Sequence, residues 1–191
     1  VYALIPRDFD FTEARELLEG LPRDWQAPGS VRYFDAYYRG LLAMMTGDAR
    51  QALEHLEAAV RIAERTGSSP FQRAAEEMVA VQLRRIGRYD EAAAAFSALH
   101  DQAMRENDPC RQAGVLGNMG LSALRAEEAG IGHGDPRAPL RRALELLEQQ
   151  CPDDLPERQN ALLNLALAEL EAGDPAAAGA ALDRAASVEA E

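Results

Sequence analysis

The side chains that most often carry chemistry are sparse in this sequence. It has three histidines (His55, His100 and His133), two cysteines and no lysine, so all 20 basic residues are arginine. Without lysine, Schiff-base enzymes, pyridoxal-phosphate enzymes and P-loop nucleotide binders are excluded, because each needs an amine at a fixed place. No His-Glu-x-x-His or Cys-x-x-Cys pattern occurs. We therefore expect no metal site, no cofactor and no catalytic residue, hence no enzyme.

The two cysteines stand in predicted loops, each beside a proline. Cys110 and Cys151 are 41 residues apart. If their loops are equivalent junctions of neighbouring repeats, the Cα atoms lie further apart than the roughly 7 Å that a disulfide allows. The sequence therefore predicts two reduced thiols in a cytoplasmic protein.

Composition indicates an all-α chain. Of 191 residues, 37 are alanine and 24 are leucine, whereas valine, isoleucine and threonine together number 14. So few β-branched residues cannot build a sizeable sheet. The net charge of −12 argues against nucleic acid or anionic membrane as a partner.

An internal repeat is the strongest signal in the sequence. Small residues at 40, 80 and 166 are each followed by glycine seven positions later and by alanine five positions after that. Leucine or phenylalanine comes four positions further on, at 56, 96 and 182, and a last small or apolar residue three beyond it, at 59, 99 and 185. A looser third copy runs from Gly120 to Ala143, with about four residues inserted into a glycine-rich turn at 130–136.

Each copy predicts a pair of antiparallel helices. A small residue lets the two helices approach closely, and glycine ends the first helix near Gly47, Gly87 and Gly173. Asp48, Asp90 and Asp174 are expected to cap the second helices. The alanines at 52, 92 and 178 are expected to be buried where second helices meet first helices. One pair cannot bury its apolar face alone, so the pairs must stack.

This pattern resembles the tetratricopeptide repeat, in a long form of about 40 residues. The residues that carry the likeness include Gly117-Asn118-Met119-Gly120 and Leu163-Asn164-Leu165-Ala166. The resemblance implies an α-α superhelix, a solenoid of antiparallel helix pairs over 31–191, with repeats near 31–66, 70–106, 109–150 and 156–190. Residues 1–30 are read as a partial N-terminal hairpin with a helix at 12–21, followed by a junction loop containing Trp25.

The family likeness also implies a function. Tetratricopeptide arrays bind a protein or peptide segment in a concave groove lined by their first helices, so we expect a non-catalytic interaction scaffold. The alternative is a sensor or regulatory domain of a larger bacterial signalling or transcription-regulatory protein. The helix at 175–190 has an apolar face with no polar cap after it, which predicts either a homodimer through that end or a chain that is truncated there. The groove positions carried over from the family are Phe34, Tyr37, Tyr38, Leu41, Met44, Glu77, Met78, Val81, Arg84, Arg85, Asn118, Leu121, Arg125, Asn160, Asn164, Leu167 and Glu171.

Overall fold

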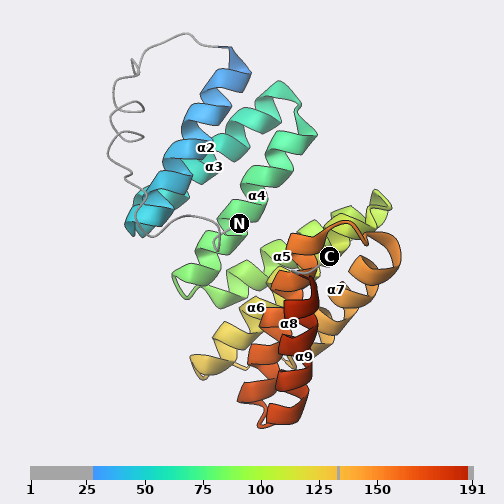
Figure 1. Cartoon of the computed structure of the whole chain (residues 1–191). Helices are drawn as coiled ribbons and strands as arrows, with labels where there is room; N and C mark the ends of the chain where they lie inside the picture. Colours follow the sequence, from blue (N-terminus) through green and yellow to red (C-terminus); the bar gives the residue numbers. More distant parts are fainter. Residues whose placement is uncertain (1–27, 133, 189–191) are drawn as a thin grey trace. The chain divides into compact units, whose positions relative to one another are not determined.

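The computed structural model describes residues 28–132 and 134–188, and all regular secondary structure in these ranges is helical (Figure 1). The predicted N-terminal helix, Trp25 and His133 lie outside the described residues. The chain divides into two compact units, one ending at Gln82 and the other beginning at Leu83. No helix in the described part of the chain is long and apolar enough to cross a membrane. The helices in chain order are α2 (Gly29–Thr46), α3 (Ala49–Thr66), α4 (Ser69–Arg85), α5 (Tyr89–Arg105), α6 (Pro109–Glu128), α7 (Arg137–Gln150), α8 (Leu155–Glu171) and α9 (Pro175–Val188).

The helices end and begin where the repeat predicts. Gly47, Gly87 and Gly173 have positive φ angles of 83°, 79° and 79°, the left-handed conformation that glycine adopts without a Cβ clash. The Asp48 carboxylate accepts a hydrogen bond from the Gln51 backbone N–H at 3.0 Å, and Asp174 accepts one from Ala177 at 2.9 Å. These are N-caps of α3 and α9, as predicted.

The predicted cap at Asp90 is wrong. Helix α5 begins at Tyr89, so Asp90 lies inside its first turn, and the N-cap position is held by Arg88. Because Arg88 stands one residue after the turn glycine, it occupies the place of Asp48 and Asp174 in the repeat. An acidic residue in the first turn is still favourable there, since it faces the positive end of the helix dipole.

Helices α2, α3 and α4 form the core of the first unit. Gly40 of α2 lies so close to α3 that a Cβ on it would come within 2.7 Å of Leu56 Cγ. The buried cluster consists of Tyr33, Ala36, Ala59, Ala63 and Ala75. This unit is therefore held together by close backbone approach over alanine and glycine, with one large ring in the middle.

The second unit repeats the same contact. A Cβ on Gly120 would lie 2.5 Å from Leu140 Cγ, which is the counterpart of the Gly40–Leu56 contact with four extra residues in between. The alanines predicted to be buried, Ala52, Ala92 and Ala178, are 0%, 0% and 1% exposed. In the third copy the insertion brings Pro136 to the equivalent position, and Pro136 is also buried. The register assigned from sequence is thus confirmed.

The inserted loop is anchored by an ion-pair cluster. Glu169 of α8 is only 3% exposed. Its carboxylate lies 2.6 Å from Arg141 Nη2 and 3.5 Å from Arg137 Nη1, both on α7. Arg137 in turn pairs with Asp135 at 2.8 Å. The loop and the start of α7 are therefore tied to α8 by charge as well as by packing.

The two cysteines are joined in a disulfide, so the prediction of two reduced thiols is wrong. Cys110 and Cys151 have Cα atoms 5.7 Å apart and their sulfurs are bonded. Cys110 lies at the start of α6, and Cys151 follows the end of α7. In an antiparallel hairpin these two points meet at the same end, whereas the prediction had placed them in separate junctions. The disulfide therefore closes the third hairpin at its open end.

Candidate partner-binding site

In the first unit, the first helices α2 and α4 share a cluster of aromatic rings. The Tyr33 ring stacks on the Phe71 ring with centroids 4.6 Å apart, and Phe34 meets Phe71 edge-on at 5.1 Å. Tyr33 stacks on Tyr37 at 5.5 Å, and Phe34 on Tyr38 at 6.0 Å. We call Tyr33, Phe34, Tyr37, Tyr38 and Phe71 the aromatic face. Its rings hold one another in place, because edge-to-face and offset-stacked pairs are favourable.

The aromatic face has a buried base and an exposed outer edge. Tyr33 is 2% exposed, and burial, followed by the nearby Tyr37 and Tyr38, raises the pKa of its phenol. Phe34 and Tyr38 are 39% and 52% exposed. The Phe34 and Tyr38 rings are thus exposed to solvent, and they pack against rings whose motion is restricted by their own contacts. Phe71 was not among the groove residues predicted from sequence. Its position just after Ser69-Pro70, at the start of a helix, is a signal in the sequence that could have indicated it.

The other groove residues of the first unit divide between core and surface. Met44 and Val81 are 1% and 4% exposed, so their side chains pack inside the protein and do not reach a partner. Leu41, Glu77 and Met78 are half-buried. Met44, which the sequence analysis placed in the groove with the tyrosines, is therefore a core residue.

In the second unit, first helices meet through polar groups. Arg84, in the last turn of α4, donates from Nη1 to Asn118 Oδ1 of α6 at 3.3 Å. On α8, Glu157 faces α6, where a Cβ on Gly114 or Gly117 would lie 3.7 Å from its Oε1. The two glycines thus make room for the Glu157 carboxylate, a role that the sequence pattern did not reveal.

Two amides on α8 are available to a partner. Asn160 and Asn164 are half-buried, and neither side chain has a hydrogen-bond partner within the described part of the chain. They stand one helical turn apart on α8, so they lie on the same side of that helix. Asn118 differs from them, because its carbonyl is already occupied by Arg84. We call Asn160 and Asn164 the amide pair.

The remaining candidates are surface or packing residues. Leu121 and Leu167 are half-buried and pack against the core of the second unit. Arg125 forms an ion pair with Glu128 at 2.7 Å. Arg85 and Glu171 are exposed.

Among the described residues, no group of three or more histidine, cysteine or acidic side chains is placed to hold a metal ion. The pKa of His55, on α3, is lowered mainly by burial and next by the charge of Arg39. Burial and a neighbouring cation both favour the neutral imidazole.

Comparison with known proteins identifies the fold. No family model matches the sequence, and no curated protein matches it closely enough to count as a relative. Solved structures do match. BtubC (BKLC) from P. vanneervenii superposes with a TM-score of 0.68 at 19% identity, over 92% of this chain and 70% of that one. A point variant of a kinesin light chain from Podosopora anserina, with nearly identical TPR-like repeats, gives 0.64 at 19% identity, over 93% and 86%.

This chain has the tetratricopeptide-repeat fold. A third structure, MamA from Desulfovibrio magneticus RS-1, agrees with a TM-score of 0.57 at 15% identity, over 93% of this chain and 84% of that one. The all-α solenoid class expected from the sequence is confirmed. At these identities the likeness establishes the fold alone, so the function of this chain has to be argued from the surfaces described above.

Proposed function

We propose that this chain is a non-catalytic interaction scaffold that binds a peptide or protein segment on the faces of its first helices. The observation that carries the proposal is the aromatic face, where Phe34 and Tyr38 are exposed on rings that already pack together. A folded protein gains nothing in stability from exposing large rings, so a cluster of them favours a binding role.

The aromatic face has the properties of a binding hot spot. Aromatic side chains contribute a large contact area, and tyrosine is among the residues most enriched at such spots. Contact with Phe71 and Tyr33 fixes the Phe34 ring before any partner arrives. Less side-chain freedom is therefore lost on binding, which favours affinity.

The amide pair extends the proposal to the second unit. An asparagine side chain offers one acceptor and two donor hydrogens, which match the carbonyl and N–H groups of a peptide backbone. Asn160 and Asn164 are half-buried and unbonded among the described residues. A partner backbone that pairs with them satisfies groups that the free protein leaves to water.

A selected peptide can test this function. Random peptides displayed on phage are selected against the wild-type protein, and the best one is synthesised with a fluorescent label. We expect Tyr38→Ala to weaken the binding of a peptide that occupies the aromatic face, and Asn164→Ala that of a peptide that occupies the amide pair, each by about 1–3 kcal/mol, since the first removes a contact and the second a hydrogen bond. Melting temperatures are expected to stay close to that of the wild type, because neither side chain is buried.

The matched control is Met104→Ala. Met104 is an apolar side chain on the second helix α5 and is 56% exposed, close to the exposure of Tyr38. It is expected to leave peptide binding unchanged. A peptide that loses affinity with Met104→Ala and not with Tyr38→Ala or Asn164→Ala would place binding on another face and contradict the proposal.

We also propose a homodimer through the last helix pair. At the leucine or phenylalanine position of the repeat, Leu56, Phe96 and Leu140 are all 0% exposed, whereas Leu182 is 46% exposed. Leu163 and Leu170 of α8 are 44% and 51% exposed as well. Leu163 and Leu170 are seven residues apart, so they lie on one side of α8. A second copy of this chain offers the same exposed leucines of α8 and α9 for a two-fold contact.

A further inference from the structure

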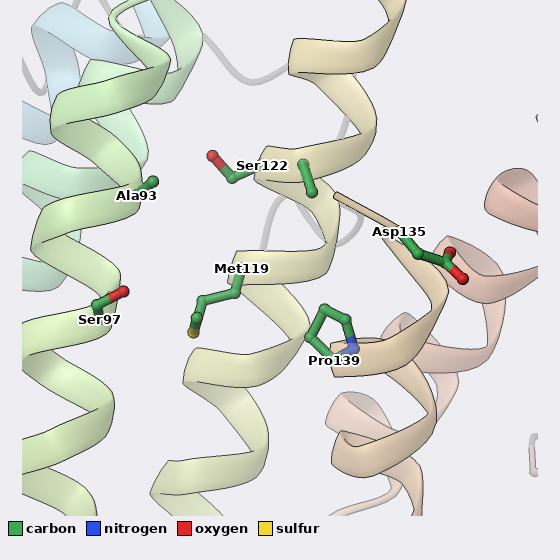
Figure 2. A pocket seen from close by; sticks show the side chains of 7 residues that line it. Ala93, Ser97, Met119, Ser122, Asp135 and Pro139 are labelled. Atoms are coloured by element: carbon green, nitrogen blue, oxygen red, sulfur yellow. The ribbon is translucent and has the colours of Figure 1, made fainter. Parts of the chain in front are cut away.

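A pocket of about 340 Å³ opens in the second unit, where α5, α6 and the start of α7 come together. It is lined by Ala93, Ser97, Met119, Ser122, Ala123, Asp135 and Pro139. Figure 2 shows the Ser97 and Ser122 hydroxyls directed into the space between α5 and α6, with the Met119 side chain reaching in below them. The volume falls within the range of small-molecule sites in proteins.

Ser122 distinguishes this pocket from an uneven part of the protein surface. The residue is 4% exposed, and its hydroxyl has no hydrogen-bond partner within the described part of the chain. Ser122 Oγ is not among the buried side-chain atoms that lack a partner, so the hydroxyl is open to the pocket and can bond with a group that enters it. A bound molecule with a hydroxyl or amide supplies that group.

The repeat explains why the space exists at this place. One 40-residue period earlier, the position of Ser122 is held by Gln82, whose Nε2 reaches across to donate to the Ala49 carbonyl at 3.2 Å. The positions of Ala93 and Ser97 are held by Leu53 and Glu57. Short side chains thus replace long ones at three positions that face one another, and the pocket is the volume that they leave.

The lining also defines the ligand. Apart from the serine hydroxyls, the side chains that reach into the space are apolar. The Asp135 carboxylate points away from the two serines (Figure 2) and is bonded to Arg137 at 2.8 Å. We propose that this pocket binds a small uncharged molecule with an aliphatic body and one hydroxyl or amide group, held by Ser122. The site is separate from the aromatic face and the amide pair, so it is independent of the function proposed above.

Cyclohexanol is a suitable probe, and methionine methyl groups report on its position. The chain has five methionines. With ¹³C-methyl labelling, we expect a saturable shift of the Met119 signal on titration with cyclohexanol. The exposed Met104, on the same helix α5 that bears Ser97, is expected not to shift. Cyclohexanecarboxylate and cyclohexylammonium have the same body with a charge, and both are expected to bind more weakly.

Variants test whether the pocket is a binding site or only a space filled with solvent. Ser122→Ala removes the hydroxyl and is expected to weaken cyclohexanol binding about fivefold to tenfold. Ala93→Leu and Ser122→Gln restore the larger side chains of the earlier copies and are expected to abolish the Met119 shift. Ala98→Leu is the matched control, because Ala98 is exposed on α5 outside the pocket lining. It is expected to bind as the wild type does.

Three results would overturn the inference. In the first, the Met119 shift rises linearly to the solubility limit and Met104 shifts with it, which indicates non-specific contact. In the second, binding persists in a folded Ala93→Leu or Ser122→Gln protein. In the third, the charged probes bind as tightly as the alcohol, so the pocket does not select an uncharged ligand.

Discussion

At the scale of single residues, Glu169 shows how a charge can be buried in a helical array. It lies at the α7–α8 contact with two arginine partners, and those arginines remain partly solvated. The pair thus keeps good geometry without burying both charges, which limits the desolvation cost. In the sequence, Glu169 is one acid among 32 and nothing in its spacing marks it as buried.

We predict that Glu169→Ala lowers the free energy of unfolding by about 1–3 kcal/mol, because it removes charge-assisted hydrogen bonds that anchor the inserted loop. Urea denaturation measures the change. The control is Glu145→Ala, which breaks the exposed Arg142–Glu145 pair and is expected to cost less than about 1 kcal/mol. Equal effects of the two variants would show that the Glu169 cluster is not a stabilising contact.

His55 gives a prediction about pH. Burial and Arg39 lower its pKa below the ordinary value of 6.5 in the folded protein. Below that value the unfolded chain binds the proton and the folded chain resists it, so the free energy of unfolding falls as pH drops from 7 through the folded pKa. Denaturation at pH 7.5 and pH 5.5 is expected to show a smaller loss for His55→Gln than for the wild type. Parallel losses in the two proteins would assign the pH dependence to other groups.

At the scale of helices, the repeat spacing predicted most of what the structure shows. Glycine and small residues leave a clear trace in sequence because one backbone conformation or one close approach requires them, as at Gly47 and Gly120. Contacts between residues far apart in the sequence leave no such pattern. The disulfide depends on which ends of two helices meet, and the contact of Phe71 with α2 depends on how neighbouring first helices lie side by side. The predicted Asp90 cap is wrong by two residues, since the position one residue after the turn glycine, held by Asp48 and Asp174 in other copies, is Arg88 in this one.

The third hairpin is predicted to depend on its disulfide. The bond closes a 41-residue separation across α6 and α7, and cross-links of this kind stabilise by about 2–4 kcal/mol. We expect Cys110→Ala/Cys151→Ala to unfold at correspondingly lower urea concentration, and dithiothreitol to lower the stability of the wild type to the same level. The double variant is the control, since dithiothreitol is expected not to affect it. Two free thiols titrated in the unfolded, unreduced protein would contradict the bond.

At the scale of the whole molecule, the exposed leucines of α8 and α9 predict association. Sedimentation analysis over a range of concentrations is expected to show a monomer–dimer equilibrium for the wild type. Leu170→Glu/Leu182→Glu places like charges on both sides of the contact and is expected to remain monomeric, whereas Met104→Glu, at an exposed site on α5, is expected to dimerise as before. A wild type that stays monomeric at the highest concentrations would refute the proposed contact.

The central claim is that first-helix surfaces of a tetratricopeptide-repeat fold bind the partner, and an NMR footprint tests it most directly. Phenylalanine and tyrosine rings labelled with ¹³C are followed while the selected peptide is added. We predict that the Phe34 and Tyr38 signals shift and saturate together, while Phe96, fully buried on the second helix α5, does not respond. Saturable binding that leaves Phe34 and Tyr38 unmoved would contradict the account.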